Sequence, residues 1–401
     1  MKLLAPQGPL IGEVQLPISK SIANRNLIIA ALAKKTILLP HQLPEDVRVL
    51  GDLLNSNSSE INVGMAGTAM RFLTAFCAVQ EDKEIILTGD TRMKQRPIGL
   101  LVNGLRELGA DISYVEEEGF PPLKIKGIDL IGGDVHVSGG VSSQFISALM
   151  LIAPTMKNGL CIQLADEILS KPYIELTADC MRKSGIDVQF DGDIITIANG
   201  NYQIQETTIE SDWSSASYFY ALAGTKPNSK LLLKGLQLNS PQGDSILAEW
   251  FESLGVSSYQ KEEGIEISSS GEMVFPVELD FKSNPDLAQT FAFLAASLGK
   301  ELKLTGLDNL RIKETDRISA LQIELKKLGL QVESTSNSLK ISGVITAKTA
   351  DIKTYNDHRM VMSAAVLSSK METEIESPEV VAKSFPAFWN VISNLDFNQP
   401  S

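Results

Sequence analysis

The fold is constrained most strongly by a pattern that recurs four times along the chain. In each copy a helix with one apolar face ends in glycine, and two short strands follow around a polar turn. The glycines are Gly109, Gly185, Gly255 and Gly329, at intervals of 76 residues (109 to 185), 70 residues (185 to 255) and 74 residues (255 to 329). Glycine is favoured directly after a helix, where the backbone often turns left-handed. The period is too long for a solenoid and fits a compact α+β subdomain used repeatedly.

A degraded copy of this pattern occupies residues 50–64, where we expect the strand pair to be cut short. The sequence has no low-complexity linker. Its mild boundary signals are Gly and Pro clusters near residues 5–18 and a polar stretch at 200–212. We therefore predict an α+β (α/β) protein of two lobes built from repeated βα elements, with the first strand in the C-terminal lobe.

Composition excludes several classes of protein. The 401 residues carry a net charge of −13, which argues against general nucleic-acid binding. The longest apolar runs, such as residues 27–33, are shorter than a membrane span, and the N-terminus resembles no export signal, so we expect a cytoplasmic location. Three scattered cysteines without a CxxC spacing, and three histidines, predict neither disulfides nor a metal site. An anionic ligand would need a local cationic cluster that works against the negative overall field.

Cationic side chains stand at several predicted helix starts, where the helix dipole disfavours them. These starts are SKSIANR with Lys20 and Arg25, GTAMR with Arg71 after an expected Thr68 N-cap, KETDR with Lys313 and Arg317 in a helix that begins near Thr315 or Asp316, and NDHR with His358 and Arg359 after Asn356 or Asp357. A bound anion would resolve the conflict, because backbone N–H groups at a helix start attract it. Taken singly, each start could equally be solvated surface. Glu314 could pair with Arg317 along the helix, and Asp357 could neutralise Arg359.

Other polar segments add to this pattern. Ser142, Ser143 and Gln144 precede an apolar run, as expected at a helix N-terminus. Two loops carry further polar and cationic groups: RMKQRP has Arg92, Lys94 and Arg96, and ILSKPY has Ser170, Lys171 and Tyr173. Clusters of this kind are commonly mobile surface loops, and the functional alternative is a loop that closes over an anionic substrate.

The motifs that contain these residues resemble the 5-enolpyruvylshikimate-3-phosphate synthase family. From about Leu16 to Pro386 they occur in the family's order: SKSIANR, AGTAMR, RMKQRPI, SSQF, SKPY, NPDLAQT, NLRIKETDR, YNDHR and AKSFP. The resemblance implies two lobes, each with three βαβαββ repeats, one of them truncated here, and an active site in the cleft between the lobes. The C-terminal lobe would contain residues 1–18 and 211–401, and the N-terminal lobe residues 19–210.

The resemblance also implies a reaction. The family transfers the enolpyruvyl group of phosphoenolpyruvate to a ring hydroxyl of shikimate 3-phosphate by addition and elimination, and releases phosphate. This step belongs to the shikimate pathway to the aromatic amino acids. The resemblance implies no metal or organic cofactor, no nucleic-acid or membrane partner, and a monomer whose lobes close around two small anionic substrates.

Site residues follow from the resemblance position by position. Those expected around phosphoenolpyruvate are Lys20, Gly67, Arg96, Gln144, Arg317, Arg359 and Lys383. Those expected around shikimate 3-phosphate are Lys20, Ser21, Arg25, Ser142, Ser143, Gln144, Ser170, Tyr173, Asp286, Asn309 and Lys313. Asp286 resembles the base that accepts the hydroxyl proton. Glu314 resembles the donor to the methylene carbon, which needs a raised pKa or a proton relayed from Lys20 or His358.

Two positions depart from the family pattern, and two alternatives to this function stand beside it. Met65 replaces an Asn that would donate its amide to a phosphate, and Ile18 replaces a Gly. One alternative is the sister enzyme that transfers enolpyruvyl to UDP-N-acetylglucosamine. That enzyme depends on a Cys in the loop where this chain has RMKQRPI, and no Cys lies between Cys77 and Cys161. The other alternative is a non-catalytic anion-binding relative, against which the intact carboxylates of the two motifs NPDLAQT and KETDR argue.

Overall fold

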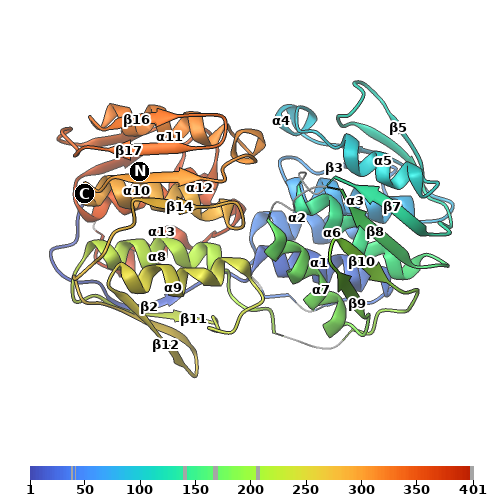
Figure 1. Ribbon diagram of the computed structural model, residues 1–401, viewed down its shortest axis with the longest axis horizontal. Coiled ribbons are helices and arrows are strands. Elements are labelled where there is room, and N and C mark those ends of the chain that lie inside the picture. Colours follow the sequence, from blue (N-terminus) through green and yellow to red (C-terminus); the bar gives the residue numbers. More distant parts are fainter. Residues whose placement is uncertain (38, 41, 139–141, 166–169, 205–207, 398–401) are drawn as a thin grey trace. The chain divides into compact units, whose positions relative to one another are not determined.

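The computed structural model describes residues 1–37, 39–40, 42–138, 142–165, 170–204 and 208–397. The chain divides into two compact units. Unit 1 consists of Met1–Ser19, Gln42–Glu45 and Glu210–Ser401, and unit 2 consists of Lys20–His41 and Asp46–Ile209. Unit 1 thus includes residues 42–45, which the sequence analysis placed in the N-terminal lobe. In Figure 1 unit 2 runs from blue to green and most of unit 1 from yellow-green to red.

Unit 2 contains two four-stranded sheets. The elements in this part of the chain are α1 (Lys20–Leu32), α2 (Glu45–Leu54), β3 (Glu60–Asn62), α3 (Gly67–Ala78), β4 (Glu84–Thr88), α4 (Thr91–Lys94), α5 (Gly99–Glu107), β5 (Asp111–Tyr114), β6 (Leu123–Lys126), β7 (Gly133–Val137), α6 (Ser143–Ile152), η1 (Ala153–Thr155), β8 (Leu160–Leu164), α7 (Lys171–Lys183), β9 (Val188–Asp191) and β10 (Ile194–Ile197). The strand orders are β3-β4-β6-β5 and β7-β8-β10-β9. In each sheet the first two strands are parallel and the closing hairpin is antiparallel, so each sheet is one βαβαββ repeat.

Unit 1 contains three sheets and both N-terminal strands. Its elements are β1 (Lys2–Leu3), β2 (Ile11–Gln15), α8 (Trp213–Thr225), β11 (Lys230–Lys234), η2 (Gly243–Ile246), α9 (Leu247–Ser253), β12 (Val256–Lys261), β13 (Gly264–Ser269), β14 (Glu278–Asp280), η3 (Pro285–Leu287), α10 (Ala288–Leu298), β15 (Leu302–Thr305), η4 (Leu310–Ile312), α11 (Arg317–Lys327), β16 (Gln331–Ser334), β17 (Leu339–Ser342), β18 (Ala350–Ile352), α12 (His358–Ala364), η5 (Ala365–Ser369), β19 (Thr373–Ile375), η6 (Pro378–Lys383) and α13 (Phe388–Asn394). The strand orders are β12-β13-β11-β2, β14-β15-β17-β16 and β1-β19-β18. Strand β2 runs parallel to β11, from Ile11 opposite Lys230 to Gln15 opposite Lys234.

The glycines of the sequence pattern end helices as expected. They follow α5, α7, α9 and α11 with positive φ angles, which are 94° at Gly109, 82° at Gly185, 72° at Gly255 and 93° at Gly329. After α5 the N–H of Ala110 also donates to the carbonyl of Leu105 at 2.9 Å, which is the long bond of a Schellman motif. After each glycine the chain reverses direction and enters the antiparallel pair of strands that completes the sheet. The prediction of a repeated fold is therefore confirmed.

One repeat lacks strands of its own. Helices α1 and α2 follow each other, and the described residues between α1 and β3 contain no strand. Strand β3 is the first strand of the next repeat, because it pairs in parallel with β4. The sequence analysis expected a shortened strand pair in residues 50–64, and that expectation is wrong in detail: the pair is absent there. The prediction that one repeat is truncated holds.

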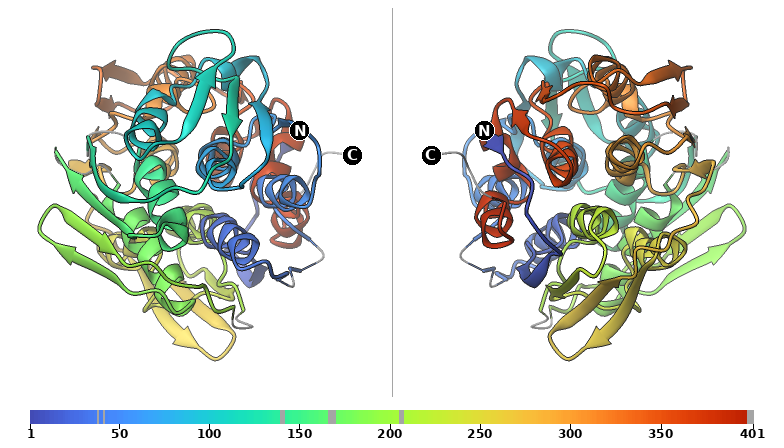
Figure 2. Two further views of the ribbon diagram at one scale, coloured as in Figure 1. Left: turned by 90° about the vertical axis from the view of Figure 1, so that its right-hand side faces the viewer. Right: turned by 90° about the vertical axis from the view of Figure 1, so that its left-hand side faces the viewer.

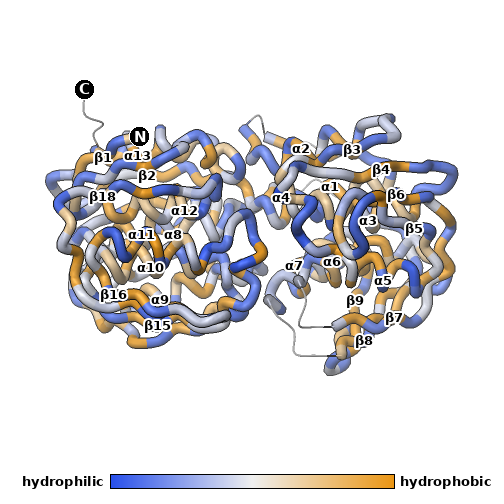
Figure 3. Tube along the Cα trace, turned by 90° about the horizontal axis from the view of Figure 1, so that it is seen from above, coloured by the Kyte–Doolittle hydropathy of each residue, from blue (hydrophilic) through white to orange (hydrophobic). Residues whose placement is uncertain are grey.

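Each unit has its own hydrophobic core, built around long apolar helices. In unit 1 every residue of α8 is buried, and α10 is buried from Ala288 through Ala296. In unit 2 the corresponding helices are α3 and α6, which pack against each other. Figure 2 shows several helices nearly along their axes with strands at the outside, and Figure 3 shows orange hydrophobic stretches alternating with blue turns. Residues predicted for the site stand at the start of α3 (Gly67) and of α6 (Ser143 and Gln144), and Asp286 lies in η3, directly before α10.

Candidate functional site

Lys20 is the first residue of α1, and its positive charge is balanced within unit 2. Its Nζ lies 2.8 Å from Oδ2 of Asp46, in the first turn of α2. Both side chains are largely buried, with 17% and 9% of their surfaces exposed. Helix α1 has no acidic residue in its own first turn, so this carboxylate comes from the neighbouring helix. The sequence analysis did not identify Asp46, since only the fold brings it beside Lys20.

Arg25 is buried one turn further along α1, and its partners are neutral groups. Its Nε donates to Oγ1 of Thr177 at 2.7 Å and its Nη2 to Oγ of Ser147 at 3.2 Å. The carbonyl oxygens of Ser21 and Tyr173 accept its remaining bonds, at 2.9 and 3.0 Å. Burial lowers the pKa of Arg25, and the described residues place no carboxylate in ion-pair contact with it. A buried cation with neutral partners favours an anion close by, and the structure brings together three of the residues predicted for shikimate 3-phosphate.

Gly67 and Arg96 form a close contact at the start of α3. Helix α3 begins at Gly67 itself, with Ala66 as N-cap, so the prediction of Thr68 as N-cap is wrong. Arg96 is buried, and its guanidinium occupies the space where a side chain at position 67 would lie. The nearby Gln144 donates from Nε2 to Oγ1 of Thr68 at 3.3 Å. A guanidinium against a helix N-terminus is unfavourable unless an anion is shared by both, which supports the anion-site interpretation.

Part of the segment RMKQRP is helical, although the sequence analysis expected a loop there. Residues Thr91–Lys94 form the short helix α4, where a loop was expected. Arg71 of α3 braces the chain just beyond α4, because its Nη2 donates to the carbonyl of Pro97 at 3.2 Å and its Nη1 to the carbonyl of Gly67 at the same distance. Arg71 therefore fixes the segment on which Arg96 sits.

The helix start predicted at the serine pair Ser142 and Ser143 is present in the structure. Ser142 is the N-cap of α6, and its Oγ accepts from the N–H of Gln144 at 3.4 Å. Ser143 is the first residue of that helix and is buried. Ser170 directly precedes α7 with a left-handed φ of 57°, and Lys171 and Tyr173 stand in the first turn of that helix, so the expectation of a loop at ILSKPY is wrong there. Residues 139–141 and 166–169, which flank these serines, lie outside the described residues.

Arg317 is the centre of an ionic cluster in unit 1. It is 1% exposed, and three carboxylates surround its guanidinium. Nε lies 2.8 Å from Oδ2 of Asp357, Nη2 lies 3.0 Å from Oε2 of Glu314, and Nη1 lies 3.1 Å from Oδ1 of Asp286. Burial alone would lower the pKa of Arg317, but the three carboxylates outweigh it and raise the pKa above its usual value. The pairing of Glu314 with Arg317, left open by the sequence, is present.

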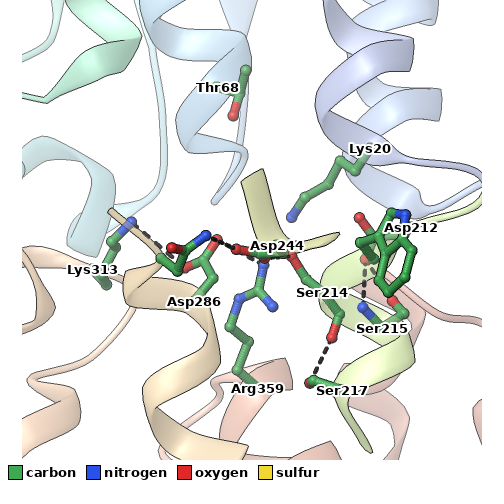
Figure 4. Close-up of polar contacts among 12 residues, drawn as sticks. Lys20, Thr68, Asp212, Ser214, Ser215, Ser217, Asp244, Asp286, Lys313 and Arg359 are labelled. Atoms are coloured by element: carbon green, nitrogen blue, oxygen red, sulfur yellow. Dashed lines mark hydrogen bonds and ion pairs between the residues drawn. The ribbon is translucent and has the colours of Figure 1, made fainter. Parts of the chain in front are cut away.

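Asp286 stands among three cations. Its Oδ2 lies 2.8 Å from Nη2 of Arg359, and its Oδ1 lies 3.1 Å from Nη1 of Arg317 and 3.7 Å from Nζ of Lys313. Figure 4 shows the carboxylate between Lys313 and Arg359. Burial opposes ionisation, yet the attraction of Arg359, Lys313 and Arg317 holds the pKa of Asp286 far below its usual range. Asp286 is therefore ionised, which suits a group that accepts a proton.

Asp357 orders the first turn of α12. It is the N-cap predicted as one of two choices, and its Oδ1 accepts from the N–H of Arg359 at 2.9 Å. The guanidinium of Arg359 pairs with Asp286, and Asp357 instead receives that of Arg317. The alternative in which Asp357 neutralises the side chain of Arg359 is therefore not what the structure shows. His358 is buried in the same turn.

The remaining predicted residues of unit 1 lie around this cluster. Lys383, at the end of η6, places Nζ 3.6 Å from Oε1 of Glu314. Asn309 directly precedes η4 and Lys313 directly follows it. Asp316 is the N-cap of α11, in agreement with a predicted helix start near Thr315 or Asp316, and accepts from the N–H of Ser319 at 3.0 Å. The unit 1 cluster, as we call Asp286, Lys313, Glu314, Arg317, Asp357, Arg359 and Lys383, therefore sets four cations against three carboxylates.

Sequence reasoning missed a second buried carboxylate close to Asp286. Asp244 in η2 is 4% exposed, and burial together with the neighbouring Asp286 raises its pKa to about 6. Its only sequence signal is the turn-like stretch PQGD, which is common in loops. Among the described residues no group of three or more His, Cys, Asp or Glu side chains is placed to hold a metal ion. No helix among them has the length and apolar character that crossing a membrane requires.

Comparisons with known proteins point to one family. The family model described as EPSP synthase (3-phosphoshikimate 1-carboxyvinyltransferase) matches residues 41–392. A protein of Bacteroides fragilis named 3-phosphoshikimate 1-carboxyvinyltransferase is 44% identical over 401 residues, covering 98% of each chain. A protein of the same name from Mannheimia succiniciproducens is 38% identical, covering 97% of this chain and 98% of its own. The solved structure of EPSP synthase from Acinetobacter baumannii aligns with a TM-score of 0.78 over 98% of this chain and 97% of that one, and at 22% identity this shows a shared fold.

Proposed function

The chain belongs to the EPSP synthase (3-phosphoshikimate 1-carboxyvinyltransferase) family, and from this premise we propose that it transfers the enolpyruvyl group of phosphoenolpyruvate to shikimate 3-phosphate. The ring hydroxyl adds to the central vinyl carbon while the methylene carbon takes up a proton. The tetrahedral adduct then loses phosphate and the added proton leaves the methyl carbon. The products are 5-enolpyruvylshikimate 3-phosphate and phosphate.

The observation that carries the proposal is the ionised carboxylate of Asp286 held among Arg359, Arg317 and Lys313. Such a group can accept the hydroxyl proton of an acceptor, while the cations around it attract the phosphate and carboxylate groups of the substrates. When the substrate anions bind to these cations, the attraction between the cations and Asp286 becomes weaker. The pKa of Asp286 then rises from its depressed value, and the carboxylate becomes a stronger base when the substrates are bound.

Glu314 is the proposed proton donor to the methylene carbon. Its two oxygens lie 3.0 Å from Nη2 of Arg317 and 3.6 Å from Nζ of Lys383. Because these contacts favour the ionised form, donation requires a proton delivered once a substrate anion engages the cations. Lys383 is close enough to Glu314 to join Lys20 and His358 as a candidate for the relay.

Unit 2 supplies further residues that we propose as ligands of the two anionic substrates. Arg25 and the hydroxyl-bearing helix starts at Ser142, Ser143 and Ser170 suit the phosphate and hydroxyl groups of shikimate 3-phosphate. Gln144 and Tyr173 stand in the first turns of the same two helices. Arg96 and the backbone at Gly67 suit the smaller phosphoenolpyruvate, with Lys20 as a point charge whose partner Asp46 can be exchanged for a substrate anion.

The monomeric state and the cytoplasmic location expected from the sequence remain part of this proposal. The three cysteines are unpaired, which supports a reducing compartment. Sedimentation velocity with and without both substrates tests the monomer.

A phosphate-release assay tests the function. With both substrates the wild-type protein should release phosphate, and with UDP-N-acetylglucosamine as acceptor it should release none. Asp286→Asn and Glu314→Gln should each lower kcat by orders of magnitude, whereas Glu333→Gln on the exposed face of β16 should leave it unchanged. Release with the UDP sugar would establish the sister activity, and no release with either acceptor would leave an anion-binding protein.

A further inference from the structure

Asp244 is a buried carboxyl group whose two hydrogen-bond partners in the described part of the chain are neutral. Its Oδ1 accepts from Nδ2 of Asn284 at 3.0 Å, and its Oδ2 accepts from Oγ of Ser214 at 2.5 Å. No cation among the described residues lies within ion-pair distance of it. A buried carboxylate without a cationic partner is costly, and an amide of the same shape in this place would avoid that cost.

The two partners of Asp244 connect it to the proposed base. Ser214 is the second residue of α8, the fully buried helix at the centre of unit 1. Asn284 directly precedes η3, the single helical turn that contains Asp286. Asp244 therefore ties the turn that presents Asp286 to this buried helix, and Figure 4 shows it between Ser214 and Asp286.

Charged groups reach Asp244 from two other elements. Asp286 on η3 repels it and raises its pKa, and Arg359 on α12 attracts it and opposes that rise. On the far side of Asp286 stand Lys313 and Arg317. Because of burial and these charges, the pKa of Asp244 is about 6, so the group changes charge within the range in which enzymes are assayed. When it ionises, its repulsion also makes Asp286 a stronger proton acceptor.

We propose that Asp244 is a positioning residue for the transfer reaction, which holds Asp286 in place through Asn284 and strengthens it as a base when ionised. This inference rests on the proposed role of Asp286. It assigns to the PQGD turn a part in catalysis without contact with either substrate.

Two substitutions at position 244 distinguish the effect of its hydrogen bonds to Asn284 and Ser214 from the effect of its charge. Asp244→Ala removes both, and a displacement of Asp286 by about 1 Å should lower kcat on the order of 100-fold, with little change in the KM of either substrate. Asp244→Asn can keep both hydrogen bonds but has no charge. It should match the wild type at pH 5.5, fall to about one third to one tenth of its kcat at pH 8, and lack the acid-side step near pH 6 in the pH profile.

Controls and a second pair of variants complete the test. Glu249→Gln removes an exposed carboxyl on the adjoining helix α9 and should leave kcat and the pH profile unchanged. Asn284→Ala should repeat the loss seen in Asp244→Ala, and the double variant should fall no further than either single one. If Asp244→Ala fails to fold, as far-ultraviolet circular dichroism would reveal, the pH profile of Asp244→Asn decides.

The outcomes distinguish this inference from the function on which it rests. If Asp286→Asn abolishes turnover while the Asp244 variants keep the kcat and the pH profile of the wild type, the positioning role is refuted and the proposed base stands. Additive losses in the double variant would also refute it. If Asp286→Asn itself turns over normally, the proposed base is wrong and the positioning role falls with it.

Discussion

Gly67 opens α3 beside the guanidinium of Arg96, and the contact leaves no room for a side chain. A Cβ atom at position 67 would lie 2.6 Å from Nη1 and 2.9 Å from Nη2 of Arg96. Ordinary contact begins at 3.4 Å, so Gly67→Ala must move the guanidinium from 2.6 to 3.4 Å, a shift of 0.8 Å. The displaced atoms are the end of a flexible side chain, and the fold should tolerate the change.

The expected effect is on phosphoenolpyruvate and not on stability. A displacement of about 1 Å in a binding group can cost on the order of 100-fold, so we expect kcat/KM for phosphoenolpyruvate to fall about 10- to 100-fold, chiefly through KM. The KM of shikimate 3-phosphate should change little, because Arg96, the group that is displaced, is not among its proposed ligands. Because the displaced group is the end of a flexible side chain, Tm should change little.

Initial rates of phosphate release at varied phosphoenolpyruvate and saturating shikimate 3-phosphate measure this effect. Gly51→Ala is the matched control, because it also adds a methyl group to a helix of unit 2 but meets its nearest atom, Cδ2 of Leu27, at 3.8 Å. The control should keep the wild-type KM. An unchanged KM for phosphoenolpyruvate in Gly67→Ala would refute the reasoning, since it would mean that Arg96 does not bind that substrate.

Two further predictions concern stability. Arg317→Met leaves three carboxylates without their shared partner, and urea denaturation should show a loss of about 3–5 kcal/mol in unfolding free energy, against less than about 1 kcal/mol for Lys303→Met, which breaks an exposed pair with Glu278. The pKa of Asp244 is about 6 in the folded protein and roughly 3.9 in the unfolded chain, so its contribution to stability is complete below about pH 4 and is lost as the pH rises past 6. Asp244→Asn should therefore unfold like the wild type at pH 4 and be more stable by about 2–3 kcal/mol at pH 8, and equal stability at pH 8 would contradict the raised pKa.

Signals that act over a few residues could be read from the sequence. The helix-ending glycines, such as Gly109 and Gly329, and the N-caps Ser142, Asp316 and Asp357 all depend on local backbone geometry, and the structure has them where the pattern put them. Local signals therefore recovered the repeat and these helix ends.

Contacts between residues that are far apart in the chain could not be predicted from the sequence. Asp46 balances Lys20 because α2 packs beside α1, and nothing in either helix alone indicates the pairing. The choice between Asp286 and Asp357 as partner of Arg359 is likewise made by packing. Thr68 is a good N-cap residue, yet the N-cap is Ala66 and α3 begins two residues earlier than a Thr68 N-cap requires, because Gly67 can stand against Arg96. At this position close packing outweighs the local preference for Thr as N-cap.

The buried guanidinium of Arg25 binds α1, a helix without strands of its own repeat, to its neighbours through Thr177, Ser147 and the backbone of Tyr173. Arg25 therefore holds its own helix in place and is also a proposed contact to the ligand. Replacing it should loosen the helix that presents Lys20, so a loss of substrate affinity in such a variant would report on the packing of α1 as well as on the missing charge.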